Sequence, residues 1–241
     1  MQNLQENTWT DEEVKRFWDY QSTIPENYFT YQIGDKLVDF FREYIKDDIF
    51  VLDYGAGAGF FSEQVLKKTN AKITSCDFSP ESVKKEIERC SKYHNYQGGY
   101  TVDELIKQNK KFDLIFCFEV IEHCNDNYLN LTFENFKNLL SENGKIIVST
   151  PNNENLRRNY IACPCCGKVF HRWQHERSWT KESLSEYAKN QGLDVISVNP
   201  TNFTITKSKK TILTKFGLAK RKDIIEKNNP NGYNLIGIFR N

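Results

Sequence analysis

Two acidic residues flank a glycine-rich bend, and their spacing could hold a charged nucleoside. Asp53 precedes Gly55, Gly57 and Gly59 in the run DYGAGAG, and Asp77 ends the next apolar run. Glycines let the backbone turn tightly and approach a ligand. The order G-x-G-x-G differs from the dinucleotide pattern, and a carboxylate before it would repel a pyrophosphate but attract an ammonium group. Because an acid roughly 20 residues further on accepts ribose hydroxyls, the pattern indicates a nucleoside with a cationic amino-acid tail.

A second polar group, Glu119-Val-Ile-Glu122-His123, follows a buried apolar run. Ligands bind at the carboxyl edge of such sheets, and a helix that begins here would place the three polar side chains on one face. Carboxylates this close need a cation, a proton or a basic partner. Oxygen and nitrogen donors suit Mn²⁺, Mg²⁺ or Fe²⁺. The alternative is a metal-free segment in which Glu119 and His123 support loops around the ligands.

The segment CPCCGKVFHRWQH, residues 163–175, is the most unusual stretch. Its C-x2-C-x4-H-x3-H order is close to a retroviral-type zinc knuckle, and four candidate ligands in so short a span indicate a metal. We expect Cys163, Cys166 and His171 to hold a structural zinc. The fourth ligand would be Cys165 or a distant cysteine, and His175 would belong to the active site. The reverse assignment of His175 and a metal-free set of thiols both stay open.

Strand and helix patterns alternate along most of the chain. Such alternation predicts right-handed βαβ units in a doubly wound, mostly parallel, seven-stranded α/β sheet of Rossmann-like type. Two late strands without a helix of normal length between them predict an antiparallel hairpin at one sheet edge. After Ser91 no third strand ending in an acid is recognisable. We expect strands at 49–54, 72–77, 112–118, 144–150, 193–198 and 233–239, and helices at 60–68, 80–90, 129–140 and 180–190.

Composition narrows the class of protein. The 241 residues carry 33 Lys and Arg against 32 Asp and Glu, a formal net charge of +1. Proteins that hold long nucleic acids by their phosphates are usually more basic, so a nucleic-acid partner is disfavoured. The polar N-terminus lacks the pattern of a signal peptide, and no apolar run is long enough to span a bilayer. Seven cysteines without an export signal favour reduced thiols. We therefore predict a cytoplasmic protein without a membrane partner.

These segments, in this order, resemble the motifs of class I S-adenosylmethionine-dependent methyltransferases. VLDYGAGAGFFS is similar to their first motif and ITSCDFSP to their second, while FDLIFCFEVIEH and GKIIVSTPN resemble the fourth-strand and fifth-strand segments. The resemblance covers about residues 49–199. It implies S-adenosylmethionine as cofactor, with Phe78 and Phe118 joining the acids and glycines of the bend as cofactor-binding residues.

A further resemblance lies downstream. STPNNENL followed by QHERSWTKESL is similar to the small-RNA 3′-terminal 2′-O-methyltransferases, which hold a divalent metal with two Glu and two His. Carried over by residue, this implies Glu119, Glu122, His123 and His175 as ligands of a catalytic Mn²⁺ or Mg²⁺. The ion would activate an acceptor hydroxyl, and either histidine could also act as general base. Gln174 departs from that family's pattern, which puts the RNA substrate in doubt.

The segment CPCCGKVFHRW also resembles bacterial methyltransferases associated with surface-polysaccharide biosynthesis. We therefore predict a metal-assisted O-methyltransferase that acts on a small polar acceptor, such as a sugar, a nucleotide-linked sugar or a phosphate-type group. One alternative is methylation of an RNA 3′ end. The alternative from another class is a nucleic-acid-binding module that uses the knuckle and a Lys-rich segment.

The predicted organisation is a helical cap over residues 1–48 followed by a methyltransferase domain over 49–241. The knuckle forms an insertion at 157–179, and a Lys-rich insertion at 205–231 precedes the last strand. This Lys-rich insertion is either a solvated surface or a place that attracts a phosphorylated substrate. Tyr28, Phe29 and Tyr31 of the cap are candidates for a lid over the cofactor or for core packing.

Overall fold

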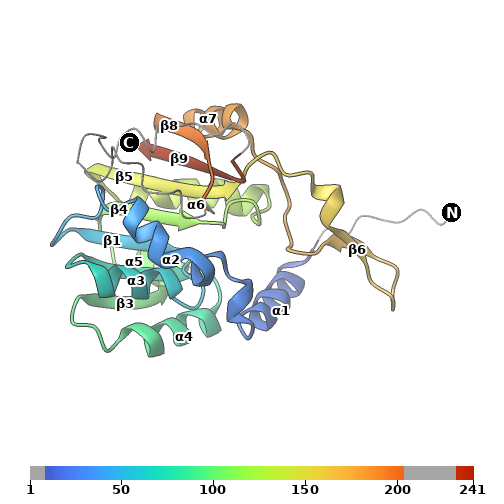
Figure 1. Cartoon of the computed structure of the whole chain (residues 1–241), viewed down its shortest axis with the longest axis horizontal. Helices are drawn as coiled ribbons and strands as arrows, with labels where there is room; N and C mark the ends of the chain where they lie inside the picture. The colour runs from blue at the N-terminus through green and yellow to red at the C-terminus, as the bar shows by residue number, and fades with distance from the viewer. Residues whose placement is uncertain (1–8, 204–231) are drawn as a thin grey trace, which may run out of the picture.

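The computed structural model describes residues 9–203 and 232–241. Its main feature is a seven-stranded sheet with the order β3-β2-β1-β4-β5-β9-β8 (Figure 1). The first five strands run parallel, and β9 is antiparallel to both of its neighbours, β5 and β8. The predicted doubly wound sheet and its antiparallel edge are therefore confirmed. The strands are β1 (Phe50–Tyr54), β2 (Lys72–Asp77), β3 (Tyr96–Thr101), β4 (Phe112–Phe118), β5 (Leu140–Pro151), β8 (Asp194–Thr201) and β9 (Asn234–Arg240).

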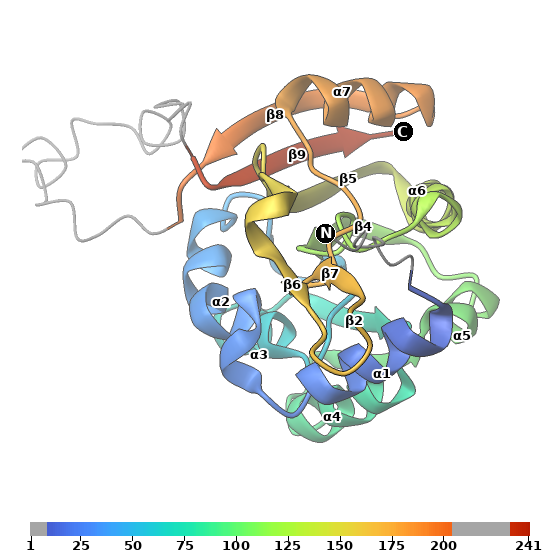
Figure 2. The ribbon, with the colours of Figure 1, turned by 90° about the vertical axis from the view of Figure 1, so that its right-hand side faces the viewer.

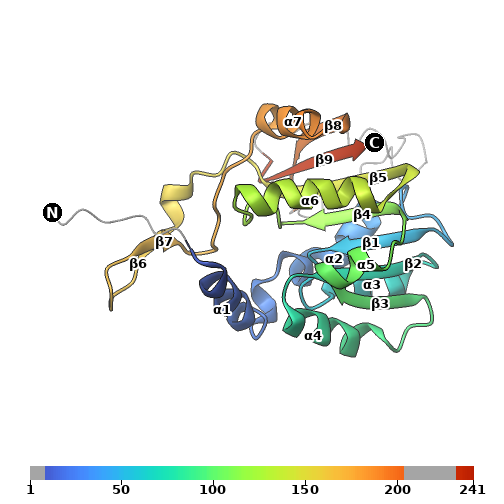
Figure 3. The ribbon, with the colours of Figure 1, turned by 180° about the vertical axis from the view of Figure 1, so that it is seen from behind.

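Helices cover both faces of the sheet, which is why a central parallel strand such as β4, FDLIFCF, is apolar and buried nearly throughout. Phe61 and Phe116 belong to the core on one face, and Leu105 and Phe133 to the core on the other, where α5 and α6 lie (Figure 3). The first face is covered by α2 (Phe29–Phe40), α3 (Phe60–Lys68) and α4 (Pro80–Cys90), the second by α5 (Val102–Lys107), α6 (Asp126–Leu139) and α7 (Lys181–Asn190).

Strand β3, which the sequence did not reveal, has the sequence YQGGYT and is only partly buried. Its two glycines break the apolar pattern, and its pairing with β2 shifts register between Ile73 and Ser75. Helix α6 begins at Asp126, earlier than predicted, because the Asn125 side chain accepts the Tyr128 amide as an N-cap. The predicted Lys-rich insertion at 205–231 lies outside the described residues.

Two segments lie beyond the carboxyl ends of the parallel strands. One is α1 (Asp11–Gln21), which begins with a capping box between Thr10 and Glu13 and leads through η1 (Pro25–Asn27) into α2. The other follows η2 (Leu156–Asn159) and is a two-stranded hairpin of β6 (Tyr160–Ala162) and β7 (Val169–His171). Figures 1 and 3 show the hairpin standing out from the body, and in Figure 2, where it faces the viewer, its turn lies in front of α1. Among the described residues, no helix combines the length and the apolar character needed to cross a membrane.

Candidate active site

The glycine bend joins β1 to α3 at the carboxyl edge of the sheet. Gly55 and Gly57 have φ values of +75° and +56°, which side chains other than glycine rarely adopt. The amides of Gly55 and Ala56 both donate to the Cys76 carbonyl, at 2.8 and 3.0 Å, and hold the bend against β2. A Cβ at Gly55 would collide with Val120, and one at Gly57 would come within 2.6 Å of the Tyr28 ring. The bend is therefore tightly enclosed by its neighbours.

Asp53 and Gly59 lie beneath this bend and not on the wall of the cavity that it borders. The Asp53 carboxylate accepts a hydrogen bond of 2.7 Å from the Ser62 hydroxyl, and burial raises its pKa to about 7. A Cβ at Gly59 would meet the side chain of Glu86, a fully buried acid whose pKa burial raises well above its usual range. The predicted direct contact of Asp53 with an ammonium group is thus not what the structure shows, because its side chain supports the bend from below.

Asp77, at the end of β2, does line the cavity together with Phe78. Its two carboxylate oxygens accept the amides of Gly57 and Ser79, each at 2.9 Å, and burial raises its pKa to about 6. The Phe78 amide adds a third hydrogen bond, and because a carboxylate can accept about four, Asp77 retains some acceptor capacity. Asp77 therefore lies on the cavity wall, and its contact with ribose hydroxyls stays a prediction.

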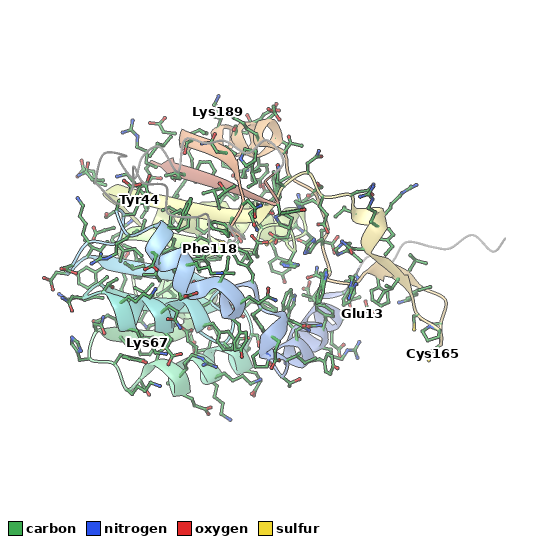
Figure 4. All side chains as sticks on the ribbon, in the orientation of Figure 1. Glu13, Tyr44, Lys67, Phe118, Cys165 and Lys189 are labelled. Atoms are coloured by element: carbon green, nitrogen blue, oxygen red, sulfur yellow. The ribbon has the colours of Figure 1, made fainter. Side chains whose placement is uncertain are left out.

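A single cavity of about 590 Å³ extends from the glycine bend to the Glu-x-x-Glu-His segment. Phe118, at the end of β4, lies on its wall and in the centre of the molecule (Figure 4). The sequence reasoning missed the part of this wall that follows β3, which is formed by Thr101, Val102 and Asp103. These residues lie beside Asp77 in sheet order and are the candidates for contacts to a base.

Glu119 lies in a turn. A helix beginning at this residue, which the sequence pattern suggested, is not formed. Its φ is +54°, and its amide donates to the Ser149 carbonyl. The carboxylate accepts the Ser149 hydroxyl at 2.7 Å and the Asn234 amide at 3.3 Å. Burial raises its pKa to about 7. Glu119 therefore borders the cavity but is tied to the sheet, and it is not part of the close group formed by the next two polar residues.

Glu122, His123 and His175 offer ligand atoms that all lie within 4.8 Å of one another. Only 1 % of Glu122 is exposed, and neither of its carboxylate oxygens has a hydrogen-bond partner among the described residues. Burial first and the neighbouring Glu119 second raise its pKa well above the usual value. Because a buried carboxylate without a partner is strongly disfavoured, this position requires a proton or a cation.

The hydrogen bonds of the two histidines fix their tautomers. His123 Nδ1 lies 3.3 Å from the Gln174 carbonyl, which can only accept, so the lone pair is left on Nε2, 3.8 Å from Glu122. His175 Nδ1 lies 2.5 Å from a carboxylate oxygen of Glu154, so Nδ1 carries a proton and Nε2 is the ring nitrogen that remains as a possible ligand atom. Burial, and then the charge of His175, lower the pKa of His123 to about 3, so this imidazole is neutral near pH 7. Both rings can therefore act as ligands or bases.

Glu154 and His171 lie next to His175 and extend the group of Glu122, His123 and His175. His171 is buried, and its Nδ1 accepts the amides of Trp173 and His175, so its proton is on Nε2, 3.3 Å from Glu154. Although burial by itself raises it, hydrogen bonds from the two histidines hold the pKa of Glu154 well below its usual value. The rings of His171 and His175 stack at 4.4 Å. The sequence reasoning missed Glu154, although it follows β5 at the edge where ligands bind.

The predicted grouping of His171 with Cys163 and Cys166 is wrong. In the hairpin, His171 pairs with Tyr160 at the base, whereas the cysteines form the turn at the other end. Amides of Cys165 and Cys166 hydrogen-bond to Cys163 and lower the pKa of its thiol. None of the described His, Asp or Glu side chains completes a close group of three with these cysteines. A zinc ion at the turn stays a prediction.

Gln174, which replaces an acid of the family that the segment resembles, links three parts of the site. Its φ is +60°, and its side-chain amide donates to the His123 carbonyl at 3.0 Å. Its side-chain oxygen accepts the indole N–H of Trp18 on α1 at 3.1 Å. The Trp18 ring in turn meets His123 edge-on, with centroids 4.8 Å apart. Through Gln174, α1 is held against the histidines.

Comparison with known proteins agrees with this arrangement. A family model described as a methyltransferase domain matches residues 21–198. The chain belongs to this family and is a class I S-adenosylmethionine-dependent methyltransferase. A ubiquinone biosynthesis O-methyltransferase of Pelagibacter ubique is 27% identical over 170 residues, which cover 66% of this chain and 67% of that protein. Malonyl-[acyl-carrier protein] O-methyltransferase 1 of Ilyobacter polytropus is 32% identical over 134 residues, 54% of this chain and 48% of that protein.

Solved structures show the same fold. A chain in the complex of the Haloferax volcanii Trm112 methyltransferase activator with a methyltransferase aligns over 94% of this chain and 96% of its own length, with a TM-score of 0.66 and 15% identity. An S-adenosylmethionine-dependent methyltransferase from Clostridium acetobutylicum aligns over 94% of this chain and 98% of its own, with a TM-score of 0.59 and 16% identity. At such identities the likeness concerns the fold alone.

Proposed function

We propose that the protein transfers the methyl group of S-adenosylmethionine to a hydroxyl oxygen of a small acceptor, with Glu122, His123 and His175 holding a divalent cation beside that hydroxyl. The observation that carries this proposal is the unpaired, buried Glu122 carboxylate, which shares its cavity with the glycine bend. The relatives named above support transfer to oxygen, since both are O-methyltransferases.

The residues at the bend fit the cofactor. Gly57 has no Cβ, which would otherwise come against the Tyr28 ring, so space remains beside the bend. The buried Asp77 carboxylate can accept further hydrogen bonds, and Phe78 adds an exposed ring to the wall. A carboxylate at this edge suits the ribose and the positive charge of S-adenosylmethionine. When bound, this group supplies an activated methyl, and most of the rate gain comes from alignment of the methyl with the acceptor oxygen.

The donor set at Glu122 fits a divalent cation. Two imidazole lone pairs and one carboxylate suit Mn²⁺ better than Ca²⁺, which prefers oxygen alone, and no thiolate is present to select softer ions. A bound ion would lower the pKa of an acceptor hydroxyl. His175, held by Glu154 through Nδ1, would receive the hydroxyl proton on its Nε2.

The wall of the cavity favours an uncharged acceptor. Several aromatic side chains line it, among them Trp9, Trp18, Tyr128 and Trp173, and Lys15 is the only Lys or Arg among its described residues. Aromatic faces suit a sugar or another hydroxylated ring, whereas one lysine among several acids gives little hold on RNA or phosphate groups. The names of the two relatives refer to ubiquinone biosynthesis and to malonyl-[acyl-carrier protein]. A surface-polysaccharide acceptor therefore stays a prediction without support from them.

The test measures formation of S-adenosylhomocysteine with a panel of sugars and phenols, before and after chelation. We expect the chelated protein to bind S-adenosylhomocysteine normally but to lose turnover, and Mn²⁺ or Mg²⁺ to restore it. Glu122→Gln should behave like the chelated enzyme, with Glu134→Gln on α6 as control. Full turnover in excess chelator, with no metal found by elemental analysis, would refute the metal and leave His175 with Glu154 as the base.

A further inference from the structure

The turn of the β6–β7 hairpin carries a metal-binding half-site that the active site does not use. Cys163 and Cys166 have the C-x2-C spacing of a zinc site, and the amides of Cys165 and Cys166 hydrogen-bond to Cys163. Gly167 closes the turn with a φ of +72° and has open space around it. Cys165 and Cys166 are exposed, and Figure 4 shows Cys165 at the far end of the hairpin.

The described parts of one chain do not complete this half-site. A closed zinc site needs four ligands, and the nearby Glu13 is engaged by Thr10 and Lys168. Residues 1–8 and 204–231, which lie outside the described structure, contain neither Cys nor His. Cys165 lies in the same turn and offers at most a third thiol. The chain's remaining cysteines and histidines lie elsewhere: Cys76, Cys90 and Cys117 are fully buried, Cys124 bonds to Val120, His94 is exposed between α4 and β3, and His123, His171 and His175 belong to the active-site group.

We infer that Cys163 and Cys166 of two copies of the chain together hold one Zn²⁺, which joins the copies through their hairpin turns. The pairing is isologous, with the same two residues contributed by each copy, as two-fold symmetry requires. Each thiol that binds the ion releases its proton. The turn stands away from the body at one end of the molecule, so a second copy can approach it (Figure 1).

Two features around the turn favour this arrangement. The groove beside Cys163 and Cys166 is lined by the aromatic rings of Trp9, Phe17 and Phe170, while its cations Arg16 and Lys168 pair with Glu12 and Glu13, so it offers apolar surface to a second copy. Ile161 on β6 is 45 % exposed and adds apolar surface next to the turn. Both features would be buried by a second copy seated on the hairpin.

The experiment measures molar mass by light scattering and zinc by elemental analysis on the full chain, under a reductant that prevents disulfides. We expect a dimer that becomes a monomer on chelation and returns with Zn²⁺. Cys163→Ser and Cys166→Ser should each remain monomeric, whereas Cys165→Ser should still form the dimer. Because the active site can also bind metal, the zinc assigned to the turn is the difference between wild type and the Cys163→Ser/Cys166→Ser double variant. That difference should be one ion per two chains.

Several results would overturn this inference. They are a difference of one zinc per chain in a monomer, equal zinc in wild type and double variant, or a dimer that survives chelation. S-adenosylhomocysteine affinity of each variant checks that it folds, since the turn lies outside the cavity that holds Asp77. The outcome is independent of the proposed reaction, because it is read from mass and zinc content and not from turnover.

Discussion

Replacing Glu154 by Gln tests how one buried carboxylate sets the proton positions of two histidines. One of its oxygens accepts from His175, while the other accepts the Asn159 amide at 2.9 Å and faces the protonated Nε2 of His171. A Gln side chain has one acceptor end and one donor end. If the Gln oxygen faces His175, the Gln NH₂ group faces two other donors, the Asn159 amide and Nε2–H of His171. If the Gln side chain is in the opposite orientation, its NH₂ group donates to Nδ1 of His175 and the His175 proton must lie on Nε2. That orientation removes the lone pair needed by the Glu122 group.

The size of the effect follows from the bond that is lost. A hydrogen bond to a charged group contributes about 1.5–3 kcal/mol, and about 1.4 kcal/mol corresponds to a factor of ten. We therefore expect Glu154→Gln to weaken Mn²⁺ binding by roughly 10- to 100-fold, the range found when an outer partner of a metal-binding histidine is removed. Cofactor affinity should stay unchanged, since Glu154 does not line the cavity.

Calorimetric titration of Mn²⁺ into chelated protein measures this loss, with Glu186→Gln on the exposed side of α7 as the matched control. A second readout needs no metal. Because the folded protein lowers the pKa of Glu154, the carboxylate stabilises the fold above its unfolded pKa, near 4.5, and this contribution is lost as the pH falls. The gap in unfolding free energy between wild type and variant should therefore shrink in acid. Unchanged Mn²⁺ affinity together with a pH-independent gap would refute the role of Glu154.

Three further predictions concern the cofactor side and the buried acids. Asp77→Asn should weaken S-adenosylhomocysteine binding at least tenfold for each ribose hydrogen bond lost, at about 1.5–3 kcal/mol per bond; equal affinity in calorimetry would contradict the ribose assignment. Gly57→Ala should lower Tm and cofactor affinity, because its φ is +56° and the new Cβ would reach Tyr28. Partial recovery in Gly57→Ala/Tyr28→Ala would separate the steric cost from the backbone cost, and an unchanged Tm in Gly57→Ala would argue against both costs. Burial raises the pKa of Glu119 to about 7 and that of Glu122 well above its usual value, so without metal the folded state binds more protons than the unfolded state and loses stability as the pH rises toward 7. Mn²⁺ should then raise Tm more at about pH 7.5 than at about pH 5.5, and the reverse order would exclude Glu122 as its ligand.

The cofactor side of the cavity could be predicted because its determinants are local in sequence. The bend needs glycines at positions with positive φ, and Asp77 ends a strand whose apolar run is plain to read. The same logic failed at β3, where a partly buried strand with two glycines has no periodic pattern. It also overstated Asp53, because an acid before the bend can point into the cavity or beneath it, and spacing does not distinguish the two.

The acceptor side was harder because loops after different strands form it. The ligand spacing of residues 163–175 suggested one knuckle, but hairpin register separates its cysteines from its histidines. A pattern of ligand types fixes how many residues lie between two side chains, not whether they share the turn or the base of a hairpin. Glu154 carried no motif at all, and only its place after β5 could have drawn attention to it.

The excess of buried carboxylates explains why two cationic ligands suit one cavity. Burial raises the pKa of five acids around this edge, and no described Lys or Arg forms an ion pair with any of them. The five acids are Asp53, Asp77, Glu86, Glu119 and Glu122. Such groups are stable when protonated or when a cation lies close. S-adenosylmethionine would bring positive charge to the glycine end, and a divalent ion would bring it to the histidine end. Without these ligands the buried carboxylates avoid the free-energy cost of an uncompensated charge by holding protons. Either ligand would reduce that cost, and each should bind with release of protons near neutral pH.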